Sequence, residues 1–381
     1  MRACLLALSL TKATGGPAKS VAAFQRALGA DVVSWIDSRH DPAEPQIWER
    51  CAVVRGSTLP ILSTLGYPQR SGLAEAERIV AAADIVSCHS FWRWHSIWLD
   101  AAARRHRVPY WFVPHGGLDP YVFEDGRLVK NAFLSLGGRA FLDHATAVVC
   151  ATDREYRKLQ PLMPQARPAV IPWPLDDADF RDRDPRRRHR VRSELGIPED
   201  AVAALSFGRL HPMKRPLETI DAFAAGATSR AHLVIVGNEA GVSHEDCRDR
   251  ARRAKIGDRV HVVGPAFGDA KYSYFDACDL YVSLSHRENF NYTAAESLAS
   301  GLPVLLSPGN DLAPDLAPHG CGWMLASLDD APALLAAVTS AAPASLLAMG
   351  RRGRSWAEVH LRFDAFRTRI VSLAEAIARH G

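Results

Sequence analysis

Residues 280–307 read LYVSLSHRENFNYTAAESLASGLPVLLS. An apolar run at 280–285 leads into a polar loop, a helical pattern begins near Asn291, and a second apolar run follows at 303–307. Short apolar runs separated by a helix are typical of parallel strands, which crossover helices cover on both faces. The stretch therefore predicts two parallel strands joined by a helix.

The same alternation of short apolar runs and longer helical patterns extends through the chain and occurs in two successive sets. Strands are predicted at 4–10, 31–37, 85–90, 110–116, 147–152 and 168–172 in the first set, and at 202–208, 232–237, 260–264, 280–285, 303–307 and 322–325 in the second. Two such sets predict an α/β protein with two doubly wound, Rossmann-like parallel-sheet domains.

The first domain is expected at residues 1–175 and the second at 201–353, with a helical stretch at 354–381 after the last strand. Residues 176–200 are rich in Asp, Arg and Pro and make the best linker candidate. Their run RRRHR at 186–190 is either a solvated loop and helix start or a contact for anionic lipid head groups.

Composition excludes some classes of function. The 381 residues are 48% hydrophobic and 23% charged, as expected of a soluble globular protein. The net charge of +4 and the pI of about 8.7 are too mild for bulk nucleic-acid binding, so no nucleic-acid partner is expected. They suit a protein that handles anionic phosphates or touches an anionic membrane. No apolar run of about 18 residues occurs, so no membrane-spanning helix is predicted.

The seven cysteines are scattered without a CxxC pair or a zinc-ligand spacing, and most lie in apolar runs. They are expected to be buried thiols in a reducing compartment, which predicts a cytoplasmic protein, either free or peripheral at the inner face of the membrane. The opening MRACLLALSL resembles a short signal peptide, but no A-x-A cleavage site follows, so we expect a first strand there.

Ligands of doubly wound domains bind beyond the carboxyl ends of the strands, so the loops that follow strands carry the candidate residues. The loop TGGPAKS at 14–20 has two glycines that either let the backbone approach a phosphate or simply make a tight turn. It matches neither GxGxxG nor a Walker A loop, because Ala18 stands where the latter has glycine.

The loop FGRLHPMKR at 207–215 follows the first strand of the second set. Arg209 and Lys214 lie five residues apart and can converge on one diphosphate. The arginine can bind two oxygens at once and the lysine adds a point charge. The alternative is a pair of exposed basic residues.

Glu288 and Glu296 form an E-x7-E pattern after the strand at 280–285. Eight residues of helix rise about 12 Å, a span comparable to the distance between the sugar and the ribose of a nucleotide sugar. One carboxylate can therefore accept hydrogen bonds from sugar hydroxyls and the other from ribose hydroxyls, with the helix N-terminus facing the diphosphate. Simple solvation of either carboxylate is the alternative.

Together, the Gly-Gly loop, the Arg209 and Lys214 clamp, the E-x7-E segment with its Gly-Leu-Pro-Val ending and the last helix resemble the retaining family 4 glycosyltransferases, which have the GT-B fold. The resemblance covers nearly the whole chain. It implies that the first domain binds the acceptor, that the second binds the nucleotide sugar at a cleft between them, and that residues 354–381 return to pack on the first domain.

The resemblance also implies roles for single residues. Arg209 and Lys214 grip the diphosphate, Glu288 holds the transferred sugar, and Glu296 holds the ribose. The other donor-binding positions are Asn289, Phe290 and Asn291 along the sugar and phosphate site, Gly16 near the phosphates, and Gly264 and Pro265, which read the base through backbone groups. His115, within PHGG at 114–117, faces the donor sugar; a histidine that caps a strand end is the alternative.

Two positions depart from the family pattern. Glu288-Asn289-Phe290 replaces a common E-G-F, and Pro172-Trp173-Pro174 replaces an Asn-Gly turn before the linker. The stretch HSFWRWH at 89–95 resembles the aromatic acceptor loop of some polysaccharide-assembly members, with His89, Trp92 and Arg93 as acceptor-binding residues. A core-and-rim role for its tryptophans is the alternative.

The resemblance implies catalysis by His115, Glu288, Arg209 and Lys214, with no metal, no cofactor, no protein general base and retention of the anomeric configuration. The predicted function is transfer of a hexose from a UDP- or GDP-linked donor to a saccharide or lipid-linked saccharide acceptor in surface polysaccharide biosynthesis. The basic stretches at 104–107 and 186–190 indicate peripheral membrane contact. A nucleotide-sugar epimerase and a non-catalytic nucleotide-sugar binder are the alternatives, and the oligomeric state is not predicted.

Overall fold

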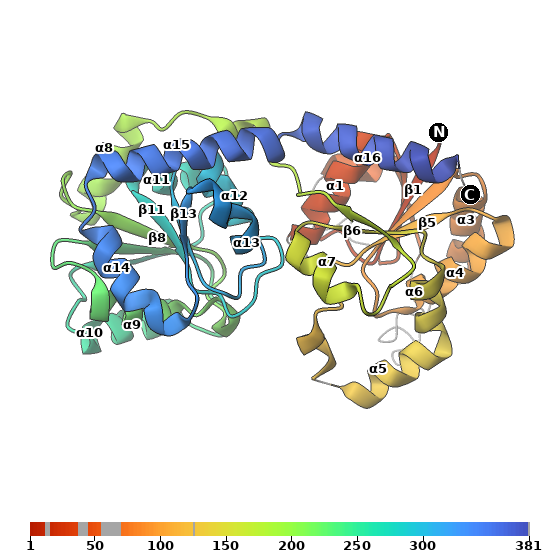
Figure 1. The fold of residues 1–381 in the computed structure, drawn as a ribbon, viewed down its shortest axis with the longest axis horizontal. Coiled ribbons are helices and arrows are strands. Elements are labelled where there is room, and N and C mark those ends of the chain that lie inside the picture. The colour runs from red at the N-terminus through yellow and green to blue at the C-terminus, as the bar shows by residue number, and fades with distance from the viewer. Residues whose placement is uncertain (12–15, 37–44, 55–69, 125, 380–381) are drawn as a thin grey trace. The chain divides into compact units, whose positions relative to one another are not determined.

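The computed structural model describes residues 1–11, 16–36, 45–54, 70–124 and 126–379. The chain divides into two compact units (Figure 1): unit 1 comprises Met1–Pro174 with Phe363–Gly381, and unit 2 comprises Leu175–Arg362. Each unit is built on one parallel sheet with helices on both faces. The predicted α/β architecture of two Rossmann-like domains is therefore confirmed.

The sheet of unit 1 has seven parallel strands in the order β3-β2-β1-β4-β5-β6-β7. They are β1 (Ala3–Ala7), β2 (Asp31–Ser34), β3 (Cys51–Val53), β4 (Ile85–His89), β5 (Tyr110–Val113), β6 (Ala147–Cys150) and β7 (Arg167–Val170). Six of the seven are predicted strands, which end earlier than expected because their last apolar residues belong to the following loops. β3 is missing from the prediction, since its three half-buried residues at the sheet edge are fewer than the four to eight expected of a strand.

Helices flank this sheet on both faces (Figure 1). They are α1 (Gly16–Leu28), α3 (Arg70–Ala81), α4 (Trp94–His106), α5 (Arg127–Phe133), α6 (Arg139–His144), α7 (Asp153–Leu159) and α16 (Phe363–Ala378), with shorter turns η2 (Pro45–Arg50), η3 (Pro120–Phe123) and η4 (Leu134–Gly138). The last helix, α16, packs on α1. The Arg26 guanidinium lies 3.7 Å from the centroid of the Phe363 ring, and the Phe24 and Phe366 rings are 5.1 Å apart.

The sheet of unit 2 has six parallel strands in the order β10-β9-β8-β11-β12-β13. They are β8 (Ala203–Phe207), β9 (His232–Val236), β10 (Val260–Val263), β11 (Leu280–Ser283), β12 (Val304–Leu306) and β13 (Gly322–Met324). All six are predicted strands. The helices are α8 (Pro185–Leu195), α9 (Pro216–Gly226), α10 (His244–Arg253), α11 (Asp269–Ala277), α12 (Tyr292–Ala299), α13 (Ala313–Leu316), α14 (Ala331–Thr339) and α15 (Pro343–His360), with turns η5 (Asp177–Phe180), η6 (Pro212–Lys214), η7 (Ala317–His319) and η8 (Leu328–Asp330).

The expected start of the returning helix, residue 354, differs from the structure. Residues up to Arg362 stay with unit 2, and the chain joins unit 1 only at Phe363. The reason is close packing of α15 on the end of α12: a Cβ added at Gly350 would lie 2.0 Å from the Gly301 carbonyl oxygen. The helix therefore continues along unit 2 until it ends at His360.

The expected linker, residues 176–200, also belongs to unit 2. Its arginines attach α8 to α11 and to the start of β11. Arg192 is fully buried; its Nη2 lies 2.7 Å from Asp279 Oδ2 and its Nε donates to the Ala277 carbonyl at 2.8 Å. Arg188 Nη1 lies 2.9 Å from Asp279 Oδ1. Within the run 186–190, Arg187 and Arg188 pair with Asp276 and Asp279, which neither expectation includes. Arg186, His189 and Arg190 are exposed in the first turns of α8, as expected of a solvated helix start.

Two further expectations concern thiols and membrane spans. All seven cysteines lie in the described part of the chain and none forms a disulfide; six are buried, and burial raises the pKa of the Cys247 thiol to about 11. In the described ranges, no single helix is long and apolar enough to span a membrane. One bent pair of helical stretches, Leu328–Thr339 with Pro343–Ala378, passes the same criterion by length and composition alone.

Candidate active site

The strand order places a switch point between β8 and β11 in unit 2, because the chain moves outward from β8 to β9 on one side and from β11 to β12 on the other. Ligands of doubly wound sheets bind at such points, beyond the carboxyl ends of the strands. The loops after β8 and β11 are joined there: the His286 N–H donates to the Met213 carbonyl at 2.8 Å, and Lys214 pairs with Glu288.

Glu288 is held firmly at this point. Its Oε2 accepts from Lys214 and, at 3.3 Å, from the Ser285 hydroxyl. Its N–H donates to the Gly309 carbonyl at 2.9 Å, and its carbonyl accepts from Asp311 N–H at 2.8 Å, which fixes the backbone to the loop after β12. Within the described ranges Oε1 makes no hydrogen bond, so one carboxylate oxygen of a positioned side chain is available to a ligand.

The three residues after Glu288 differ in whether their side chains have a polar atom available to a ligand. Asn291 is the N-cap of α12: its Oδ1 accepts from Ala294 N–H at 3.1 Å and its Nδ2 donates to Asn310 Oδ1 at 2.8 Å. Phe290 is buried with its ring 5.0 Å from that of Tyr292. Asn289 Oδ1 is buried and has no hydrogen-bond partner in the described chain. Only Asn289 therefore leaves a side-chain polar atom to be satisfied by a ligand.

Glu296 lies on α12 with 5% of its surface exposed. Its Oε1 is 3.3 Å from Lys271 Nζ on α11, and Lys271 also lies 3.0 Å from Asp179 Oδ1 in η5. Burial lowers the pKa of Lys271, but attraction to Glu296 and Asp179 outweighs it and raises the pKa overall. Lys271 is a site residue that the sequence analysis misses, because nothing in its local pattern distinguishes it from a solvated helix lysine.

Arg209 and the predicted base-reading residues lie at the same edge of the sheet. Arg209 is exposed, and its guanidinium makes no hydrogen bond or ion pair with residues in the described ranges. Gly208 before it has φ 154°, and a Cβ at Gly237 would lie 1.7 Å from the Gly208 carbonyl oxygen, so the loop passes very close to β9. Gly264 and Pro265 are exposed after β10, two strands away from β8.

In unit 1 the switch point lies between β1 and β4, and His115 stands in the loop after β5. Its φ of 50° is unusual for a residue other than glycine. The turn is held by Glu155, whose Oε1 accepts from Gly116 N–H at 2.8 Å and whose Oε2 accepts from Ala151 N–H at 2.9 Å. Sequence analysis misses Glu155, although Thr152-x-x-Glu155 is a recognisable capping pattern at the start of α7.

The His115 ring contacts two other polar side chains. Its Nε2 lies 2.9 Å from His89 Nδ1 and 3.5 Å from Ser20 Oγ, and its centroid is 5.7 Å from that of Trp173. Burial lowers the pKa of His115 to about 3. Ser20 is in the first turns of α1, which begins at Gly16, so the structure brings the start of α1 close to His115; Thr14 and Gly15 lie outside the described residues.

The three predicted acceptor residues do not form one surface. His89 is 1% exposed and both ring nitrogens are hydrogen-bonded, to Ser87 and to His115, so direct contact with an acceptor is corrected to an internal role. Trp92 donates from Nε1 to the Gly117 carbonyl at 2.5 Å and packs on Phe91 and Phe123, as the core-and-rim alternative expects. Arg93 is exposed.

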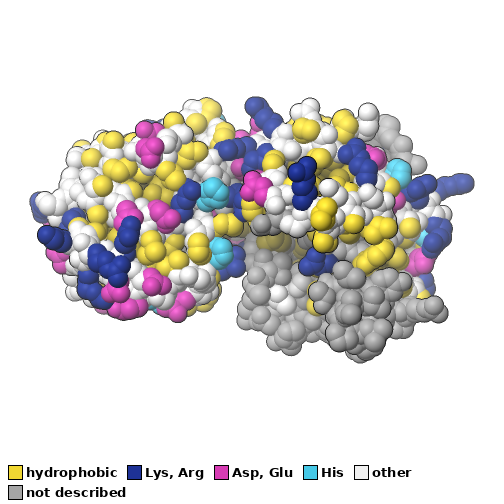
Figure 2. Space-filling model, turned by 90° about the horizontal axis from the view of Figure 1, so that it is seen from below, with side chains coloured by type: hydrophobic (Ala, Val, Ile, Leu, Met, Phe, Trp, Pro, Cys, Tyr) yellow, Lys and Arg dark blue, Asp and Glu magenta, His cyan; other side chains and the backbone are white. Residues whose placement is uncertain are grey.

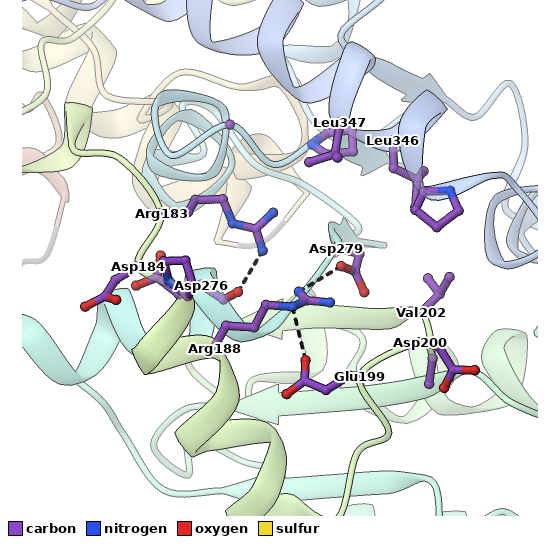
Figure 3. A pocket seen from close by; sticks show the side chains of 15 residues that line it. Arg183, Asp184, Arg188, Glu199, Asp200, Val202, Asp276, Asp279, Leu346 and Leu347 are labelled. Atoms are coloured by element: carbon purple, nitrogen blue, oxygen red, sulfur yellow. Dashed lines mark hydrogen bonds and ion pairs between the residues drawn. The ribbon is translucent and has the colours of Figure 1, made fainter.

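A separate pocket of about 340 Å³ lies at the opposite edge of the unit 2 sheet, beside the residues that precede β8, β11 and β12. Figure 3 shows Arg188 extended across it between Asp279 and Glu199, to which it is paired. Its arginines are already paired, so we do not assign this pocket to the donor. In the described ranges, no group of three or more His, Cys, Asp or Glu side chains could hold a metal ion.

Two parallel-sheet domains with binding loops at their switch points define the GT-B class of fold. Residues 16–174 match the family model described as "Glycosyl transferase 4-like domain", and residues 187–343 match that described as "Glycosyl transferases group 1". The two matches together cover most of the chain, which belongs to the GT-B glycosyltransferases.

Relatives agree with this assignment. Over 255 residues the chain is 32% identical to D-inositol 3-phosphate glycosyltransferase of Acidothermus cellulolyticus, covering 61% of this chain and 54% of that one. Over 215 residues it is 27% identical to alpha-monoglucosyldiacylglycerol synthase of Streptococcus pneumoniae, covering 55% and 48%. The chain thus spans about half the length of the curated relatives it matches. Its fold is similar to that of Anabaena Alr3699/HepE in complex with UDP and glucose, with a TM-score of 0.75, 17% identity, and coverage of 99% and 100%.

Proposed function

We propose that this protein is a retaining, metal-independent hexosyltransferase that uses a nucleotide-diphosphate sugar. The observation that carries the proposal is the joined pair of loops at the β8 and β11 switch point. They place the Lys214 cation against the Glu288 carboxylate, beside an exposed Arg209 and the N-terminus of α12. Such a combination offers positive charge to a diphosphate and a carboxylate to sugar hydroxyls.

The proposed roles follow from these contacts. Arg209 and Lys214 bind the diphosphate, and Lys214 exchanges part of its contact with Glu288 for a phosphate oxygen. Glu288 accepts hydrogen bonds from the transferred hexose through Oε1, and Asn289 supplies a second acceptor. Glu296 binds the ribose hydroxyls, and Lys271 Nζ, 3.3 Å from its Oε1, holds the carboxylate in place.

A UDP-linked hexose is the proposed donor, with a GDP-linked hexose as the alternative. HepE, which has a similar fold, was solved with UDP and glucose and with UDP-glucose. Gly264 and Pro265, the proposed base-reading residues, would offer backbone groups to the base, so these two positions do not decide between uracil and guanine.

In the proposed mechanism the basic groups stabilise the nucleoside diphosphate as it leaves, and the acceptor hydroxyl attacks the face from which it departs. A leaving phosphate oxygen takes the acceptor proton, which makes a protein general base unnecessary and gives retention of configuration. Charge stabilisation by fixed cations and a helix N-terminus is the work that a divalent ion performs in other enzymes.

The proposed acceptor is a lipid-linked saccharide in surface polysaccharide synthesis, and we propose α5 as the membrane contact. On α5, Leu128 and Val129 are 85% and 72% exposed and follow the exposed Arg127, and Leu136 in the next turn, η4, is 67% exposed. Figure 1 shows α5 at the periphery of unit 1, away from its sheet. Burial of an exposed Leu or Val contributes about 1.5–3 kcal/mol.

The basic run at 186–190 is a poorer membrane contact because Arg187 and Arg188 are paired with Asp276 and Asp279 of unit 2. On the face in Figure 2, basic and acidic side chains are interspersed over unit 2.

Co-sedimentation with anionic phosphatidylglycerol vesicles tests the assignment of α5 as the membrane contact. Leu128→Asp should weaken binding at least tenfold, whereas Val359→Asp, at a 62% exposed position on α15, should not. Equal binding by Leu128→Asp and the parent protein, or no binding by the parent, rules α5 out.

The reaction itself is tested by following UDP- and GDP-hexoses by proton NMR, with and without saccharide and lipid-linked acceptors, in chelator. Transfer predicts acceptor-dependent release of the nucleoside diphosphate and a product whose anomeric coupling matches that of the donor. An epimerised donor without acceptor supports the epimerase alternative. A bound but unchanged donor under all conditions supports the non-catalytic binder.

A further inference from the structure

A chain of four hydrogen-bonded side chains crosses the interior of unit 1 and ends at His115. Trp111 Nε1 donates to Ser87 Oγ, Ser87 Oγ lies 3.0 Å from His89 Nε2, and His89 Nδ1 lies 2.9 Å from His115 Nε2. Trp111, Ser87 and His89 are each no more than 1% exposed, while His115 retains some exposure. The inner end of the chain is therefore sealed from water, and only His115 can meet a ligand.

The tryptophan fixes the direction of every hydrogen bond in this chain. An indole N–H can only donate, so Ser87 Oγ accepts from Trp111. Within the described ranges the remaining partner of the Ser87 hydroxyl is His89 Nε2, to which it must donate its hydrogen or leave it unsatisfied in the interior. His89 then carries its own hydrogen on Nδ1 and donates it to His115 Nε2.

Among the residues that the structure describes, His115 Nδ1 has no hydrogen-bond partner. Its Nε2 lone pair is occupied by His89, so a neutral His115 carries its hydrogen on Nδ1. Protonation of Nε2 would set two N–H groups against each other at 2.9 Å. The other polar groups nearby do not reverse this order: Ser20 Oγ donates to the Pro17 carbonyl at 2.8 Å, and the Glu155 carboxylate is bonded to backbone N–H groups of Gly116 and Ala151.

We propose that Ser87 and His89 are positioning residues that hold His115 in its Nδ1–H tautomer, so that His115 offers a neutral hydrogen-bond donor and no free lone pair to the sugar. His115 then binds a hydroxyl oxygen of the transferred hexose and cannot act as a general base. The tautomer of His115 follows from hydrogen bonds within the protein alone. Its consequence for catalysis rests on the proposed glycosyltransferase function.

The test is the tautomeric state of His89 and His115 in the full chain labelled with ¹⁵N-histidine, measured by long-range proton–nitrogen NMR. His89→Gln and His115→Gln spectra assign the two rings. Both histidines should show a hydrogen-bearing Nδ1 and a bare Nε2, and His115 should stay neutral between about pH 5 and pH 8, where an ordinary histidine changes charge. A hydrogen on His115 Nε2 in the parent protein, in either a neutral or a charged ring, overturns the proposal.

Substitution of Ser87 gives the second readout. Ser87→Ala should give mixed tautomers at both histidines and lower kcat with UDP-glucose about tenfold, the effect of one misplaced hydrogen bond, with little change in KM. Ser87→Thr, which keeps the hydroxyl, should restore the single tautomer of each histidine and the kcat of the parent protein. Ser34→Ala is the matched control, because Ser34 is also buried on a strand of this sheet but donates to the Ile36 carbonyl.

The positioning role of Ser87 and the proposed nucleotide-sugar donor can be refuted separately. Unchanged tautomers in folded Ser87→Ala overturn the positioning role, and if that variant does not fold, the tautomers of the parent protein decide alone. Absence of turnover with UDP-glucose, together with the expected tautomers, counts against the proposed donor and leaves the positioning chain intact.

Discussion

At the scale of single residues, the pairing of Lys214 with Glu288 places the cation that we propose for the diphosphate against the carboxylate that we propose for the sugar. The two roles can be separated by removing the charge of Glu288 while keeping its size. If Glu288 serves the hexose and Lys214 the diphosphate, the substitution should affect transfer and nucleotide binding in opposite ways.

Glu288→Gln is therefore expected to lower kcat about 100-fold, in the range of other lost transition-state contacts, while UDP alone binds as tightly as to the parent protein or more tightly. The reason is that Lys214 loses its competing carboxylate. Steady-state kinetics and titration calorimetry check the two parts. Glu358→Gln on α15 is the surface control. Weaker UDP binding by Glu288→Gln contradicts the division of roles.

Lys271 is the second informative residue, because it lies between two buried carboxylates. Its removal leaves Glu296 and Asp179 without their cation, and breaking a buried pair costs about 3 kcal/mol or more. Lys271→Met should lower the free energy of unfolding by about that amount in urea denaturation, whereas Lys255→Met, at an exposed position, should change it by less than about 0.5 kcal/mol.

The pH dependence of stability gives an independent check of the same contact. The pKa of Lys271 is raised on folding from its ordinary value of 10.5. Its contribution is therefore fully present below about pH 10.5 and is lost as the pH rises through the higher folded value. The parent protein should lose more stability than Lys271→Met in this alkaline range. Parallel pH profiles for the two proteins contradict the assignment.

The residue scale also shows where prediction from sequence reaches its limit. Arg209, Lys214 and Glu288 could be proposed because they follow strands in loops with a recognisable pattern. Lys271 and Ser87 could not, since Asp179, Glu296 and Trp111 are distant from them in sequence and become neighbours only through the fold. His89 was predicted to contact an acceptor because HSFWRWH resembles the acceptor loop of some family members. In the structure its ring is buried and hydrogen-bonded to Ser87 and His115.

At the scale of elements, periodicity predicts the parallel strands well and the boundaries between units less well. Continuous apolar runs identify strands such as β9, whereas β3 is too short and too exposed to be recognised. Residues 176–200 look like a linker because they are charged, yet the arginines of α8 pair with a carboxylate of α11 and donate to one of its carbonyls. Charge content alone does not reveal whether such partners exist.

The packing of α15 gives a prediction at this scale. Gly350→Ala adds a favourable helix former but places a Cβ 2.0 Å from the Gly301 carbonyl oxygen, which forces α15 away from α12. The free energy of unfolding should fall by about 2 kcal/mol. Gly257→Ala, whose added Cβ would be 3.5 Å from its nearest neighbour, is the control and should change stability little. Equal stability of the two variants in urea denaturation contradicts the close approach.

At the scale of the whole molecule, each unit is a doubly wound sheet whose candidate residues lie mostly in loops that follow its strands. Family membership follows from matches to both units, and the fold class follows from the strand orders. The donor base, the acceptor and the need for a metal are determined by contacts with ligands, which neither the sequence pattern nor the protein's internal contacts specify. The central claim is thus that unit 2 binds a nucleotide sugar through Arg209 and Lys214 without a metal.

The most direct test of that claim is thermal unfolding in chelator with UDP, GDP, ADP and their hexose conjugates, for the parent protein, Arg209→Ala and Arg248→Ala. A ligand at 100 times its dissociation constant stabilises the folded protein by about 2.7 kcal/mol. We predict a clear rise in Tm with one nucleotide family, lost in Arg209→Ala and kept in Arg248→Ala, whose arginine is on the surface of α10. No rise with any nucleotide, or an equal rise in Arg209→Ala, contradicts the claim.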